Sequence, residues 1–299
     1  MAFQVVSSVP HPSPGAKNWA LGPVWRAHRK GSVDLSGGRC LPSIVTALRV
    51  LGGLRIDIAN PSDDCMTCQP SVTPTLPDGA NRGLDLTREA GRFLRNDDEP
   101  GLRRYLARAW SIGELAELLQ GDDSVVSWLA AYCLGTIGGP VSVMPLARAL
   151  HHEDAAIVAA AEDGLWRIWF DEAGVAVRRR LQRAADQVDL ERFDAARAIL
   201  EEIIARHPTF SEAYNQRSIL RYLQDDHLGA LADCKRTISL NRCHFGAHAG
   251  LGHAHAHLGN FQDAIACYKT ALQIHPRMDG LRQSIRRIGS LANRANPVA

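Results

Sequence analysis

The chain has 299 residues, a formal net charge of +2 at pH 7, 45% hydrophobic residues and 22% charged residues. These values are ordinary for a globular protein, and the balanced charge gives no sign of a nucleic-acid or membrane partner. The length suggests about two domains. The seven cysteines lack the even count and regular spacing of a disulfide framework, so we expect a reducing, cytoplasmic compartment.

The first part of the chain, residues 1–80, is predicted to be mostly disordered. Residues 1–38 are rich in Ser, Pro and Gly and show no apolar periodicity that could offset the entropy of ordering. An organelle transit peptide, or a true start of translation at Met66, would also explain this composition. Organised sequence begins near Gly83, and the apolar spacing over 84–110 predicts two helices that cap the following repeats.

The next part, residues 111–172, contains a repeat with a step of 31 residues. Each copy reads as a short apolar helix, an acidic turn and a longer Ala-rich helix, and Ser111 with Glu114 has the form of a capping box. The matching positions are Leu119, Asp123, Ala130, Leu134 and Ile137, then Leu150, Asp154, Ala161, Leu165 and Ile168. This pattern resembles the HEAT-like repeat of phycobilin-lyase-type proteins.

An aromatic cluster of Trp166, Trp169 and Phe170 closes the second of these copies. We expect it to form core packing where the two kinds of repeat meet. An aromatic site that stacks on a ligand is the alternative.

The last part, residues 173–294, repeats three times with a step of 34 residues. Small residues recur in two sets, Ala184, Ser218, Gly252 and Ala196, Ala230, Ala264; ring side chains recur at Phe193, His227 and Phe261. Two helices that cross closely need small side chains at the contact, so each copy is predicted to be an antiparallel helix pair. A step of 34 is the tetratricopeptide period.

The third copy resembles the tetratricopeptide family most closely, at Leu251, Gly252, Gly259, Phe261, Ala264, Tyr268, Ala271 and Pro276. The two resemblances together imply an all-α, right-handed α-solenoid of HEAT-like and then tetratricopeptide helix pairs, closed by a C-terminal capping helix. Such a stack is usually a binding surface rather than a catalyst.

No motif for catalysis is found in the sequence. No segment matches a phosphate loop, a nucleophile elbow or a zincin helix, so we predict neither catalytic residues nor a cofactor. Cys65 and Cys68 form a single C-x-x-C pair, which is too few ligands for structural zinc. His253 and His257 share a helix face but lack further converging ligands, so we predict no metal site there.

Two other groups of charged or ionisable residues have ordinary explanations. His151 and His152 lie next to acidic residues, where an acid–base pair is possible but a solvated turn is favoured. Arginines cluster at 178–180 and again at Arg282, Arg286 and Arg287, and we interpret both clusters as solvated helix faces.

The family resemblance implies that the first helix of each tetratricopeptide pair lines a concave groove. The predicted partner-binding residues are Glu212, Asn215, Ile219, Tyr222, Leu223, His253 and His257, with Arg178, Leu181 and Ala185 beside them. Chaperone-tail binders of this family clamp a carboxylate with Lys, Asn and Arg. The matching places here carry Leu181, Ala185, Gln216, Ala249 and Gly250, so chaperone-tail binding is not expected.

The sequence therefore predicts a non-catalytic scaffold that binds a protein or peptide segment through an apolar-centred groove. Tyr222 is the expected anchor, and His253 with His257 would make binding depend on pH near 6.5. The alternative is an accessory protein of the lyase type that holds a chromophore- or substrate-bearing protein. Neither the partner nor the oligomeric state follows from the sequence.

Overall fold

The computed structural model describes residues 78–295. Over this range all regular structure is helical, as predicted, and there is no strand. The prediction of disorder over 1–80 lies outside the described residues except at 78–80, which belong to the first described helix. The predictions of a start at Met66 and of an inert Cys65–Cys68 pair lie wholly outside them.

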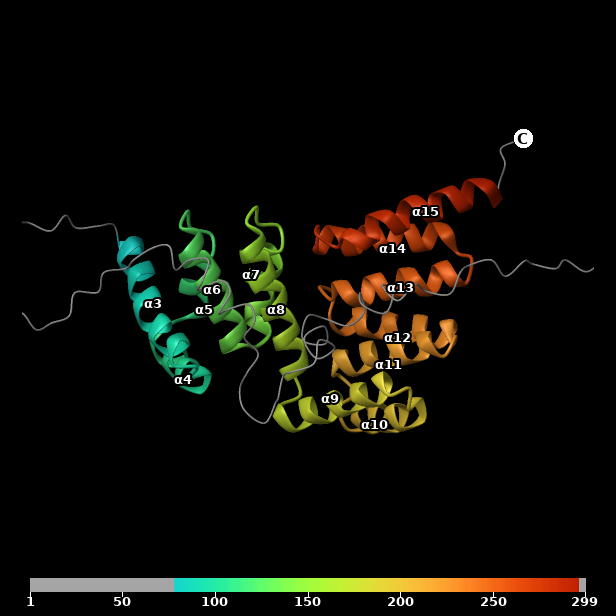
Figure 1. Cartoon of the computed structure of the whole chain (residues 1–299), viewed down its shortest axis with the longest axis horizontal. Helices are drawn as coiled ribbons and strands as arrows, with labels where there is room; N and C mark the ends of the chain where they lie inside the picture. Colours follow the sequence, from blue (N-terminus) through green and yellow to red (C-terminus); the bar gives the residue numbers. More distant parts are fainter. Residues whose placement is uncertain (1–77, 296–299) are drawn as a thin grey trace, which may run out of the picture.

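The helices form two groups that stand side by side (Figure 1). The N-terminal group consists of α3 (Asp78–Arg95), α4 (Glu99–Ala109), α5 (Ile112–Leu118), α6 (Ser124–Ile137), α7 (Pro140–Ala149) and α8 (Ala155–Asp171). The repeat array consists of α9 (Val175–Asp189), α10 (Phe193–Arg206), α11 (Ser211–Leu223), α12 (His227–Leu240), α13 (Phe245–His257) and α14 (Phe261–Ile274). The final helix, α15 (Asp279–Ala295), packs on α14.

The acidic turns of the 31-residue repeat act as helix caps. The carboxylate of Asp123 accepts hydrogen bonds from the backbone N–H groups of Val125 and Val126 at the start of α6, and Asp154 caps α8 in the same way. The predicted capping box is also present, because Ser111 and Glu114 bond each other's backbone N–H groups at 3.1 and 2.8 Å. These caps satisfy N–H groups that have no partner within the helix.

Small residues allow close crossings of helices in both groups. At Gly252 of α13, an added Cβ would lie 2.5 Å from Tyr268 Cε1 and 3.2 Å from the carbonyl oxygen of Ala264, both on α14. In the N-terminal group, a Cβ on Gly135 of α6 would lie 2.5 Å from the Cα of Gly164 on α8. Neither site has room for a side chain while the helices keep this spacing.

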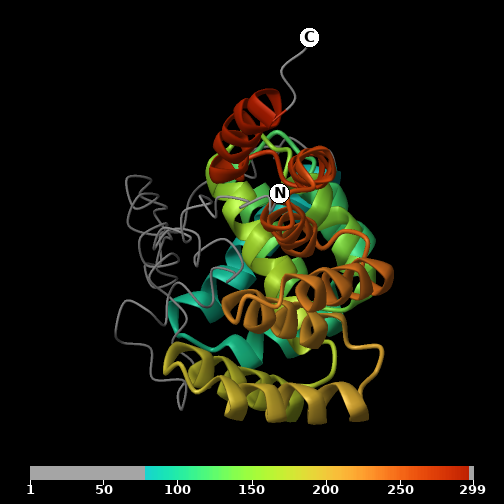
Figure 2. The same cartoon turned by 90° about the vertical axis from the view of Figure 1, so that its right-hand side faces the viewer.

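Helix α8 joins the two groups by running across the ends of the array helices (Figures 1 and 2). Glu172, just past its C-terminus, lies 3.3 Å from the Ser211 hydroxyl at the start of α11. Near its middle, Glu162 meets His275, after α14, at 3.3 Å. Before its N-terminus, the carbonyl oxygens of His152 and Glu153 accept hydrogen bonds from Arg277, next to α15.

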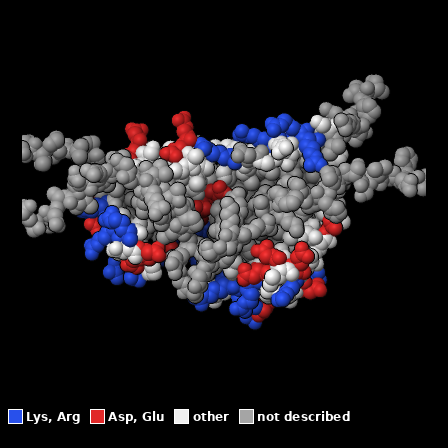
Figure 3. All heavy atoms as spheres, in the orientation of Figure 1, with Lys and Arg blue, Asp and Glu red and all other residues white. Residues whose placement is uncertain are grey.

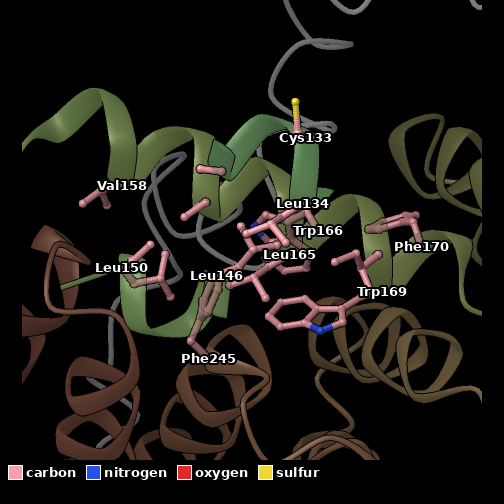
Figure 4. Packing of buried hydrophobic residues seen from close by; sticks show 14 of the residues in the cluster. Cys133, Leu134, Leu146, Leu150, Val158, Leu165, Trp166, Trp169, Phe170 and Phe245 are labelled. Atoms are coloured by element: carbon pink, nitrogen blue, oxygen red, sulfur yellow. The ribbon is translucent and has the colours of Figure 1, made fainter. Parts of the chain in front are cut away.

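The aromatic cluster of α8 fills the centre of this joint (Figure 4). The Trp169 ring stacks on His244 at a centroid distance of 4.4 Å, and Trp166 meets Phe245 edge-on at 5.4 Å. All of these side chains are buried. The cluster is therefore packing at the junction with the array, as predicted, and it makes α8 and the start of α13 part of one core.

Candidate partner-binding face

The seven predicted binding residues lie on the first helices of the second and third repeats. We call this set the first-helix face. It comprises Glu212, Asn215, Ile219, Tyr222 and Leu223 on α11, and His253 and His257 on α13. The two ends of the face differ in exposure, and they differ in what covers them.

The end near α8 is buried inside the chain. The side chains of Glu212 and Asn215 are 0% and 3% exposed. The Glu212 carboxylate accepts hydrogen bonds from Asn215 Nδ2 at 3.0 Å and Gln216 Nε2 at 2.6 Å, and it pairs with His244 Nε2 at 2.8 Å. A partner could reach these groups only by opening the joint with α8.

The same contacts assign the proton on His244. Its Nδ1 accepts the backbone N–H of Ala247 at 3.0 Å and so caps the start of α13. The ring proton must then be on Nε2, which donates it to Glu212. Each of these hydrogen bonds lowers the cost of burying the Glu212 carboxylate, because a buried charge needs donors to replace water.

The opposite end of the face is a cluster of rings that joins the second repeat to the third. Tyr222 lies 5.2 Å from His257 and 5.4 Å from His227 between ring centroids, and His227 and His257 are 4.5 Å apart. Deeper in, His253 Nδ1 is 2.8 Å from the hydroxyl of Tyr268. Tyr222, Leu223 and His257 keep part of their surface exposed.

His227 belongs to this cluster, although it was not predicted as a binding residue. The sequence feature that could have identified it is the 34-residue period it shares with Phe193 and Phe261, which puts a ring at the start of each second helix. The next residue, Leu228, is 69% exposed, so apolar surface continues beyond the rings.

Burial makes the interior of the ring cluster uncharged. Burial, reinforced by the nearby His257, lowers the pKa of His253 to about 3. Burial, with a smaller contribution from Asp225, raises the pKa of Tyr222 to about 12. Both side chains are neutral from pH 5.5 to 8, so the predicted titration near pH 6.5 is wrong for His253.

Neither a metal site nor a membrane-spanning helix is found among residues 78–295. No group of three or more His, Cys, Asp or Glu side chains in that range could hold a metal ion. No helix there combines the length and apolar character needed to cross a bilayer.

Comparison with known proteins identifies the repeats of the array. Tetratricopeptide repeat models match residues 181–243 and 246–278, so the array consists of tetratricopeptide repeats, as the 34-residue period predicted. A TPR repeat-containing protein from Rhizobium etli is 26% identical over 108 residues, which are 36% of this chain and 53% of that protein. The match thus spans about half the length of this curated relative. The HEAT-like assignment of residues 111–172 stays a prediction.

Two solved structures with similar folds are complexes of tetratricopeptide domains. The first TPR of Spaghetti (RPAP3), bound to an HSP90 peptide, is 17% identical with a TM-score of 0.38, covering 39% of this chain and 92% of that chain. The TPR2AB domain of yeast Sti1, in a pHSP90 complex, is 14% identical with a TM-score of 0.34, covering 71% of this chain and 97% of that chain.

Proposed function

We propose that this protein is a non-catalytic scaffold, and that a segment of a partner protein binds to the exposed end of the first-helix face. The observation that carries this proposal is the ring cluster at that end. There Tyr222 and His257, from neighbouring repeats, meet at 5.2 Å and keep part of their surface exposed. Stacked repeats present extended surfaces of this kind to peptides.

The composition of this end favours an apolar anchor from the partner. Tyr222 and Leu223 are partly exposed and supply aromatic and aliphatic surface, Ile219 behind them is only 9% exposed, and the partly buried His253 is neutral. A peptide helix or an extended segment that inserts an apolar side chain matches such a surface. Glu212 and Asn215 take no part in this proposal, because they are buried at the joint with α8.

A partner held by its terminal carboxylate does not match this face. The five positions where chaperone-tail binders carry their clamp are occupied here by Leu181, Ala185, Gln216, Ala249 and Gly250, and all five are buried. None of these side chains is cationic. We therefore expect an internal segment of the partner, rather than a C-terminal tail, to be recognised.

The test compares two tyrosines of the same helix. A partner is first captured with the wild-type chain, and its affinity is then measured for Tyr222→Ala and for the control Tyr214→Ala. Tyr214 is also partly exposed, but its hydroxyl bonds to Pro208 O and its ring lies near Arg217 and Arg236. An aromatic anchor contributes roughly 2 kcal/mol or more, so Tyr222→Ala should weaken binding about 30-fold.

The control should bind within about twofold of the wild type, since it lies outside the proposed contact. The proposal fails if Tyr222→Ala keeps its helical circular dichroism and binds as tightly as the wild type. A visible absorption band on the purified protein would instead point to the lyase-type role.

A further inference from the structure

Helix α15 presents a basic face at the C-terminal end of the stack. Leu281 and Ile288 are buried against α14, and this orients Arg282, Arg286 and Arg287 outward, where all three are exposed. From Gly280 to Ala295 the sequence has no acidic residue. In Figure 3 the basic atoms follow the edge of the molecule that α15 forms, without acidic atoms between them.

These arginines differ from two of the arginines of α9, which have acidic partners within the chain. Arg178 pairs with Asp171 at 2.8 Å, and Arg180 pairs with Glu202. By contrast, Arg282 donates only to the carbonyl oxygen of Pro276, at 2.9 Å. Among the described residues, no ion pair involves any of the three outward arginines of α15.

We propose that this basic face binds an acidic segment of a partner protein. Arg282 and Arg286 are four residues apart and therefore neighbours on the helix surface, so two carboxylates one helical turn apart could pair with both. The planar guanidinium group can bond both oxygens of a carboxylate at once, which gives arginine an advantage over lysine in such pairing.

Other anionic partners fit the face less well. Residues 277–295 contain no aromatic side chain, so nucleic-acid bases would find nothing to stack on. From Arg282 to Arg287 the charges extend over roughly 8 Å of the helix axis, a short footprint for a duplex. The apolar side of α15 packs on α14, which leaves no apolar stripe to enter a membrane.

The test uses the full chain and a fluorescein-labelled octaglutamate peptide at about 50 mM salt, where exposed charges are weakly screened. The variant combines Arg282→Gln, Arg286→Gln and Arg287→Gln. The matched control, Arg103→Gln with Arg104→Gln and Arg108→Gln, removes the same charge from exposed positions of α4. The α15 variant should weaken binding at least tenfold and the control less than twofold.

The face is independent of the first-helix face, so Tyr222→Ala should bind octaglutamate like the wild type. A second variant, Arg286→Glu, reverses one exposed charge and should weaken binding even if the triple variant proves poorly folded. Equal weakening by the α15 and α4 variants would overturn the proposal, because affinity would then follow net charge alone. So would no binding of octaglutamate by the wild type, or tighter binding of a thymidine oligonucleotide through the same arginines.

Discussion

At the scale of single residues, two sites show how little freedom the packing leaves. Gly252 and Gly135 each lie where another helix comes too close for a Cβ. The repeat pattern identified only Gly252, which occupies the same position in its repeat as Ala184 and Ser218 do in theirs. Gly135 and the glycine it faces, Gly164, do not belong to a periodic set of small residues of this kind.

We expect Gly252→Leu to destabilise the protein by roughly 1–3 kcal/mol or more, the cost of overpacking a tight contact. The added atoms would collide with Tyr268, itself buried between α13 and α14. Urea denaturation measures the effect. The control Gly289→Ala, on α15, has nothing within 4 Å of its new Cβ and should be neutral or slightly stabilising. Equal midpoints for Gly252→Leu and the wild type would contradict the crossing.

A second prediction at this scale concerns His253. Its native pKa of about 3 lies below the unfolded value of about 6.5, so below pH 6.5 the unfolded chain binds a proton that the native state excludes. Stability contributed by neutral His253 is therefore present above pH 6.5 and lost as the pH falls toward 3. The limiting slope is about 1.4 kcal/mol per pH unit.

The measurement is the free energy of unfolding of the wild type and of His253→Gln between pH 7 and 4.5. The glutamine can still bond the Tyr268 hydroxyl but cannot titrate in this range. The advantage of the wild type over the variant should shrink as the pH falls. Parallel curves would mean that His253 is accessible to protons in the native state.

At the scale of elements, α8 is the helix on which the arrangement depends. Helix α8 runs antiparallel to the order of the repeats: Glu172, after its C-terminus, contacts α11, its two tryptophans contact the start of α13, and Glu162, nearer its N-terminus, contacts His275 after α14. One helix thus fixes the spacing of several repeats at once. Stacked repeats otherwise contact only their neighbours, so the contacts with α8 add stability that the array would lack without this helix.

We expect Trp166→Ala to cost about 3–5 kcal/mol, the range for removing a buried aromatic side chain. Trp166 contacts Trp169, Phe170, His244 and Phe245 from two groups of helices. The control Trp128→Ala removes a half-buried ring that stacks on Tyr132 within the N-terminal group. Thermal or urea unfolding should show that Trp166→Ala is clearly less stable than the control. The reverse order of stability would contradict a central role of the joint in holding the two groups together.

At the scale of the whole molecule, the joint predicts that the two groups of helices unfold together. All six tryptophans precede residue 173, so their fluorescence reports on the N-terminal part and, through Trp166 and Trp169, on its joint with the array, whereas far-ultraviolet circular dichroism reports on every helix. The two signals should give coincident urea transitions in the wild type. In Trp169→Ala, which loses the ring stacked on His244, the transitions should separate. Separate transitions already in the wild type would show two independently folding units.

Much of the architecture could be predicted from the sequence, because the features involved are periodic and local. The 34-residue step predicted the helix pairs, Gly252 their tight crossing, and Ser111 with Glu114 the start of α5. The aromatic cluster of α8 was also correctly placed at the junction. The helix pairs, the crossing and the cap depend on residues whose partners lie at a fixed distance along the chain or in the next element, whereas the aromatic cluster meets His244 and Phe245 far along the chain.

What only the tertiary structure decided is which part of the first-helix face remains accessible. Glu212 and Asn215 share the periodic pattern of Tyr222, yet both are buried, because Glu212 pairs with His244, on which Trp169 of the distant helix α8 stacks. The same burial moves the pKa of His253 far from its usual value. Periodicity records which residues share a helix face, but whether solvent reaches that face depends on contacts between distant segments, and these have no period.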